Sequence, residues 1–221
     1  MVNPELVPAI REAIKQNEIG TASPYCLSYA RLGASGASFG IFQGDTNVNH
    51  RARDTLRQAL QQNGAAADAI NRIMAAVSQP CPNGNPLDAA DTALTTQALD
   101  CSGGRALVDA QDQSLLGIVL GELDSCIAAA ATRTIDIADD ALLYIALWVN
   151  MTGAPDTLCK WLSGTQEVGL APPAPPTVTA PTIEAYLQAN SFFRLHPQNF
   201  VHMQDSVAGA VPLLPAATAA A

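Results

Sequence analysis

A glutamate that continues an apolar helical stripe is the first residue of this sequence whose type and position suit catalysis. Leu6, Ile10, Ile14 and Glu18 recur every four residues, so they share one face of a helix. A carboxylate at the rim of an apolar face is partly removed from water, which disfavours its charged form and suits a general acid. The pattern predicts a helix over residues 4–18 that ends in a candidate proton donor.

A second group of polar residues follows in the run Ser38-Phe39-Gly40-Ile41-Phe42-Gln43-Gly44-Asp45. A stretch rich in Gly, Ser, Ala and Pro ends the first helix, and residues 38–43 then predict a short strand or turn. Gln43 and Asp45 are two residues apart, so we expect both on the same side of an extended segment. Such a polar pair after a helix-terminal glutamate suits a sugar-binding cleft.

Glu18 and this run resemble the goose-type lysozyme and lytic transglycosylase group. That group pairs a catalytic glutamate at a helix end with a Gly-Leu-Met-Gln-like strand, and in goose-type members an aspartate follows the glutamine by two, as Asp45 follows Gln43 here. Residues 141–162 are similar to the late helix of the group. Val149 stands where its tyrosine is expected, and the turn after Asn150 is one residue longer.

The resemblance implies a mainly α, lysozyme-like (α+β) fold: a helical bundle with a small β-hairpin or strand region near residues 36–45. It implies an enzyme that cleaves a β-1,4-linked amino-sugar polymer, above all bacterial peptidoglycan, as a muramidase or lytic transglycosylase. Glu18 is the expected general acid and Asp45 the candidate second catalytic group. The substrate-binding residues that it implies are Ser38, Gln43, Tyr144 and Asn150.

Several alternatives stay open. If Asp45 holds a water, with its carboxyl and that of Glu18 at the roughly 6.5–9.5 Å separation of inverting enzymes, the glycosidic bond is hydrolysed with inversion. If no second carboxylate takes part, Glu18 acts first as acid and then as base, and an anhydro sugar forms. A chitosanase-like hydrolase would use Glu18 and Asp45 on a cationic glycan. A structural or binding protein would keep the fold without activity. Tyr144 and Trp148, four apart, either stack on sugars or belong to the core.

Composition narrows the class of protein. The chain has 221 residues, a net charge of −9, 48% hydrophobic and 14% charged residues, so it is globular, and no basic patch indicates a nucleic-acid partner. The three histidines are scattered and there is no CxxC, so we expect no metal and no cofactor. The sequence has no apolar run of about 18 residues, so we expect no helix that spans a membrane. No cleavable signal peptide is visible, although the proposed substrate requires an extracellular or periplasmic site of action.

The five cysteines are an odd number, which argues against a fully paired disulfide framework. Cys81 and Cys101 bracket a Pro-Asn-Gly-Asn-Pro loop and are a candidate disulfide. Cys126 and Cys159 lie in segments with helical periodicity. They are either a second disulfide pair or buried thiols.

Hydrophobic periodicity predicts further helices near residues 49–63, 65–78, 86–99, 105–131, 138–150 and 156–163, with 105–131 as the central buried helix. At the beginning of that helix, four polar residues either reach the cleft or form an acidic N-terminal turn, namely Asp109, Gln111, Asp112 and Gln113. We expect a catalytic domain over 1–170. Residues 171–181 hold five prolines and predict a strap, and the helical segment 182–214 should pack back on the main domain.

Overall fold

The structure is a computed structural model that describes residues 1–31, 33–152, 156–165 and 171–216. It is 65% helical with a small antiparallel three-stranded sheet, which confirms a mainly α fold with a small β region. By its internal contacts the chain divides into two units, and each is described by itself: unit 1 comprises Met1–Asn17 and Leu116–Ala221, and unit 2 comprises Glu18–Leu115.

Two of the three strands in the sheet of unit 2 lie where the sequence predicts a β region, near residues 36–45, and the first strand precedes that region. The sheet consists of β1 (Ser28–Tyr29), β2 (Ala37–Phe39) and β3 (Gly44–Asp45), in the order β1-β2-β3 with antiparallel neighbours. Ser38 of β2 is the Cα partner of both Ser28 and Asp45. Residues 40–43 form a turn, with φ of +81° at Gly40 and +48° at Gln43. The expectation that Gln43 and Asp45 share one side of an extended segment is therefore wrong.

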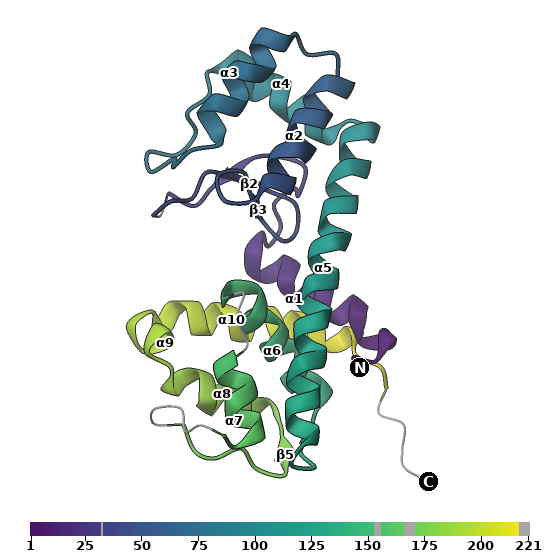
Figure 1. The fold of residues 1–221 in the computed structure, drawn as a ribbon, viewed down its shortest axis with the longest axis vertical. Helices are drawn as coiled ribbons and strands as arrows, with labels where there is room; N and C mark the ends of the chain where they lie inside the picture. The colour runs from purple at the N-terminus through teal and green to yellow at the C-terminus, as the bar shows by residue number, and fades with distance from the viewer. Residues whose placement is uncertain (32, 153–155, 166–170, 217–221) are drawn as a thin grey trace. The chain divides into compact units, whose positions relative to one another are not determined.

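The helices of unit 2 follow the periodicity of the sequence closely. They are α2 (His50–Gln62), α3 (Ala67–Val77), α4 (Ala89–Asp100) and the first half of α5 (Ser102–Ala131) (Figure 1). Asn49 caps α2, because its side-chain oxygen accepts hydrogen bonds from Arg51 N and Ala52 N. Apolar residues of the sheet and of these helices, among them Phe39, Leu56 and Ile73, form one buried cluster.

Unit 1 is helical around α6 (Asp139–Thr152), whose residues Ala141–Val149 are all buried. A helix that is apolar on every side must be surrounded by protein. The other described helices of unit 1 are η1 (Pro4–Leu6), α1 (Val7–Glu18, up to Asn17), the second half of α5, α7 (Asp156–Ser163), α8 (Ala180–Ala189), α9 (Ser191–Leu195), α10 (Pro197–Ala210) and η2 (Val211–Leu213). Among them, α8 and α10 contact α6 directly.

The prediction that residues 105–131 form the central buried helix is wrong. The helix exists, as the 30-residue α5, but only 28% of its most apolar 18-residue window is buried, and Ile118 is 59% exposed. Among the described residues, α5 is the one helix long and apolar enough to cross a membrane by length and composition, which is weak evidence for a span. The absence of a span thus stays a prediction.

The proline-rich segment 171–181 is bound along unit 1. Its strand β5 (Thr177–Val178) pairs in parallel with β4 (Asp136–Ile137), and Trp161 Nε1 donates a hydrogen bond to Pro172 O at 2.7 Å. The helices between residues 180 and 210 follow within the same unit. The predicted domain over 1–170 stays a prediction; the limits of unit 2, Glu18 and Leu115, fall inside that range.

Candidate functional site

Glu18 is the last residue of α1, as the sequence predicts, and it is half-buried. A turn follows at once, in which Ala22 N donates to Ile19 O at 2.9 Å and Gly20 has a φ of +55°. The chain then leads toward the sheet, where Gly40 N donates to Pro24 O at 2.8 Å. The segment that follows Glu18 is therefore tied directly to the turn between β2 and β3.

The side chain of Gln43 is held within that turn at both ends of its amide. Its Nε2 donates to Gly40 O at 3.0 Å, and its Oε1 accepts a hydrogen bond from Ser28 Oγ. Gln43 remains half-buried, so part of the turn faces solvent. Ser28 belongs to β1, and the sequence gives no sign of its role, because a lone serine in a loop-rich stretch carries no spacing signal.

Two side chains from α5, Asp112 and Gln111, lie against the turn. The buried carboxylate of Asp112 accepts hydrogen bonds from Ile41 N at 2.8 Å and Phe42 N at 3.4 Å. A Cβ at Gly40 would lie 2.4 Å from Asp112 Oδ1, and a Cβ at Gly44 would lie 2.4 Å from Gln111 Nε2. Glycine at both positions therefore permits the helix to approach the backbone of the turn.

The alternative that placed Asp112 in an acidic N-terminal turn is wrong, because α5 begins well before it, at Ser102. Gln111 beside it is also buried, and neither Oε1 nor Nε2 has a hydrogen-bond partner among the described residues. Asp112 thus holds the turn that carries Gln43 by hydrogen bonds, and Gln111 lies beside Gly44 at the end of that turn.

Asp45 uses its carboxylate on the backbone around the sheet. Each of its oxygens accepts from Gly36 N at 3.1 Å, and Oδ1 also accepts from Asn47 N at 2.7 Å. These bonds fix the turns before β2 and after β3, which favours a structural role. The catalytic role of Asp45 stays a prediction.

Ser38 lies in β2 and is 8% exposed, so its hydroxyl has little access to a polymer. Of the predicted site residues, unit 2 contains Glu18, Ser38, Gln43 and Asp45, and the last three gather on one small sheet and its turn.

The other two predicted residues, Tyr144 and Asn150, belong to α6 of unit 1. Tyr144 is 4% exposed, and its hydroxyl donates to the carboxylate of Glu184, which also accepts from Gln204 Nε2 at 3.0 Å. Burial, with this carboxylate, raises the pKa of Tyr144. The enclosed ring favours the core alternative over stacking on sugars. Asn150 is half-buried near the end of α6.

All five cysteines are free thiols in the structure. Cys81 Sγ lies 3.2 Å from Gln79 O and Cys101 Sγ lies 3.3 Å from Ala98 O, so each contacts its own local backbone and the predicted Cys81–Cys101 disulfide is not formed. Among the described residues, no three His, Cys, Asp or Glu side chains are grouped to hold a metal ion.

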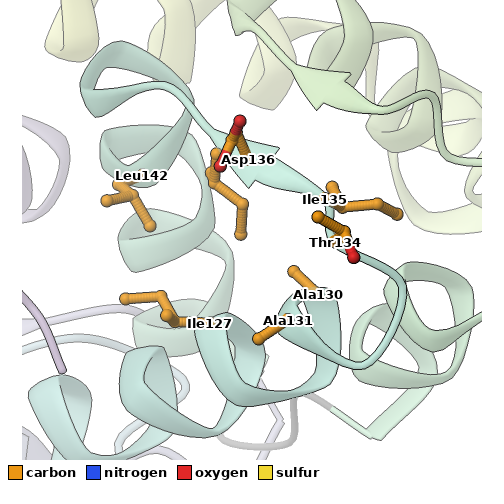
Figure 2. A pocket seen from close by; sticks show the side chains of 8 residues that line it. Ile127, Ala130, Ala131, Thr134, Ile135, Asp136 and Leu142 are labelled. Carbon is orange, nitrogen blue, oxygen red and sulfur yellow. The ribbon is translucent and has the colours of Figure 1, made fainter.

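Unit 1 has a separate pocket of about 420 Å³ between the end of α5 and β4 (Figure 2). Asp136 is the only ionisable residue among those that line it, namely Ile127, Ala130, Ala131, Thr134, Ile135, Asp136, Ile137 and Leu142. Apart from Asp136 and Thr134, the side chains of its walls are apolar.

Comparison of the chain with models of protein families, with curated proteins and with solved structures finds no match. The resemblance to the goose-type group therefore rests on Glu18 and residues 38–45, with the weaker similarity in α6 and α7.

Proposed function

We propose that this protein is a glycosidase that cleaves bacterial peptidoglycan, with Glu18 as its general acid. The observation that carries the proposal is the sequence of elements around Glu18. A helix ends at this half-buried glutamate, and the chain then enters a small antiparallel sheet whose β2–β3 turn presents Gln43. Elements in this order, with these residues, are what the resemblance to goose-type lysozymes and lytic transglycosylases implies.

The hydrogen bonds of Asp45 favour a mechanism in which Glu18 acts without a second carboxylate. Glu18 gives its proton to the glycosidic oxygen as the bond from that oxygen to the sugar C1 breaks. The resulting carboxylate takes the proton of the muramyl 6-hydroxyl, and that oxygen bonds to C1 to close an anhydro ring. This is the transglycosylase outcome, and its site of action is the cell wall, outside the cytoplasm.

A chitosanase-like hydrolase is the second candidate. The observation in its favour is the net charge of −9, because an acidic protein attracts a cationic glycan. It needs Asp45 as the partner of Glu18, and the three backbone N–H contacts to Asp45 count against that role. A protein that keeps the fold without activity is the third.

The test compares the wild type with Glu18→Gln on purified peptidoglycan and on chitosan. We expect soluble muropeptides with anhydro ends from the wild type, and at least a 100-fold lower rate from Glu18→Gln, because general acid catalysis contributes about 10²–10⁴-fold. Glu12→Gln is the matched control, since Glu12 is a half-buried glutamate on the same helix and should leave the rate unchanged.

Each other outcome points elsewhere. Muropeptides with reducing ends would indicate hydrolysis and return Asp45 to consideration. Cleavage of chitosan alone would favour the second candidate. Equal activity of the wild type and Glu18→Gln would sink the catalytic assignment, and inactivity on both polymers would favour the non-enzymatic protein.

A further inference from the structure

Two cysteines of unit 1 lie in contact although they are far apart in the sequence. Cys126 of α5 and Cys159 of α7 are separated by 33 positions, and their sulfur atoms are 3.3 Å apart, with one thiol donating a hydrogen bond to the other. Both are free thiols. A disulfide bond needs about 2.05 Å between sulfurs, so a small side-chain movement would allow them to bond.

The surroundings of the pair are those of a protein core. Cys126 is fully buried and Cys159 is half-buried. Beside them lies the buried Tyr186, whose ring is 4.6 Å from that of Trp161 between centroids. The acidic neighbours of the thiols are Glu122 and Asp156, each within one turn of one cysteine.

The remaining cysteines lack such a partner among the described contacts. Cys26 Sγ lies 3.2 Å from Ser23 O, and Cys81 and Cys101 likewise contact local backbone oxygens. The contact between sulfurs is therefore specific to one pair of the five.

We propose that Cys126 and Cys159 are a modification site that is oxidised by a disulfide co-reactant to an intramolecular disulfide, which joins α5 to α7. The other three cysteines stay as thiols, so an odd total of five cysteines is compatible with one disulfide. This inference is independent of the proposed glycosidase activity.

The reaction balances as two successive thiol–disulfide exchanges. The thiolate of Cys159, the more exposed of the two, attacks oxidised glutathione, releases one glutathione thiolate and leaves a mixed disulfide. The thiolate of Cys126 then attacks the Cys159 sulfur and expels the second glutathione. Overall, the two protein thiols lose two protons and two electrons, and the oxidised glutathione takes up both and leaves as two molecules of reduced glutathione. Because burial raises the pKa of both thiols, the folded protein should react faster as the pH rises from 7 to 9.

The disulfide would constrain the segment that contains α6, the buried helix of unit 1. Closing a loop of this length in the unfolded chain favours the folded state. We expect the melting temperature to rise on the order of 10 °C on oxidation.

Peptide mapping after incubation with oxidised glutathione tests the inference directly. Trypsin cuts after Arg105, Arg133 and Lys160. Cys126 is then the only cysteine of peptide 106–133, and Cys159 is the only cysteine of peptide 134–160. We expect these two peptides to appear cross-linked, and the thiols titrated in denaturant to fall from five to three. Reduction should restore the five thiols and the lower melting temperature.

Two variants separate the pair from the other cysteines. Cys159→Ser should show no cross-link and one melting temperature under both conditions, whereas Cys26→Ser, also half-buried, should keep the cross-link and the shift. Five thiols remaining in the wild type, or a cross-link that joins other cysteines, would overturn the proposal without any variant.

Discussion

Gly40 shows how one missing side chain shapes the candidate site. Its φ of +81° lies in the region that favours glycine, and the space where a Cβ would stand is occupied by the carboxylate of Asp112. The same carboxylate accepts the amides of Ile41 and Phe42, so the turn and the helix fix each other. The position of Gln43 depends on this arrangement.

Replacing Gly40 by alanine should therefore destabilise unit 2 strongly. We expect a loss of about 2–4 kcal/mol in the free energy of unfolding, because backbone strain adds to the displacement of Asp112. Chemical denaturation with urea measures it. Gly33→Ala is the control: Gly33 also has a positive φ, +51°, but a Cβ there meets open space, so about 1 kcal/mol is expected. Equal losses would show that the contact with Asp112 contributes nothing.

Helix α5 contains two glycines at which the structure has room for a side chain. A Cβ at Gly117 or Gly121 meets no atom within 4 Å, and both residues lie in the interior of the helix. Glycine there leaves the unfolded chain more conformational freedom and lowers helix propensity.

Gly117→Ala and Gly121→Ala should each stabilise the protein by about 0.5–1 kcal/mol, since alanine is the better helix former. Thermal and urea unfolding of each variant checks this. A loss of stability from either change would mean that the glycine meets another surface in solution.

Arg72 of α3 and Asp91 of α4 form an ion pair between the two helices. Arg72 donates two hydrogen bonds of 2.7 Å to the buried carboxylate of Asp91, and these bonds hold the pKa of Asp91 below its ordinary value. The unfolded state therefore binds a proton on this residue more readily than the folded state does.

Asp91→Asn should lower stability at neutral pH. The stabilisation from Asp91 is present above its unfolded pKa of about 3.9 and disappears as the pH falls through the lower folded pKa. The difference between the wild type and Asp91→Asn should then be full at about pH 7 and shrink below about pH 4. Urea unfolding across this range measures it. Asp54→Asn, at an exposed position of α2, is the control and should change little. A difference that persists unchanged in acid would contradict the ion pair as its cause.

At the scale of the whole molecule, net charge distinguishes between the two proposed glycan substrates. A charge of −9 repels an anionic wall polymer and attracts a cationic one. Salt screens both effects, since the Debye length falls from about 30 Å at 0.01 M to about 8 Å at 0.15 M.

If the proposed function holds, the rate on peptidoglycan should rise as salt increases over this range. The rate on chitosan, if it is cleaved, should fall. Initial rates at constant pH measure both, with a short uncharged chito-oligosaccharide as the control that should show no dependence on salt. A falling rate on peptidoglycan would mean that a local basic surface, and not the net charge, governs binding.

The sequence by itself determined the local elements of this protein. Helix periodicity placed α2, α3 and α7 within a few residues of their observed bounds, and it placed the end of α1 at Glu18. These features depend on contacts within one helix or on its caps, which are encoded by neighbouring residues. The location of β2 and β3 follows from the sequence for the same reason, because these strands and the turn between them lie close together in the chain, whereas β1 was not predicted.

Only the tertiary structure decided how distant residues are used. The turn at residues 40–43 depends on Asp112, about 70 positions later, and Tyr144 is paired with Glu184, 40 positions later. Local spacing did not predict that α6, and not α5, is the buried helix. It also did not predict that the carboxylate of Asp45 accepts hydrogen bonds from backbone amides. Periodicity shows which face of an element is apolar, whereas the partner that covers it is fixed by long-range packing.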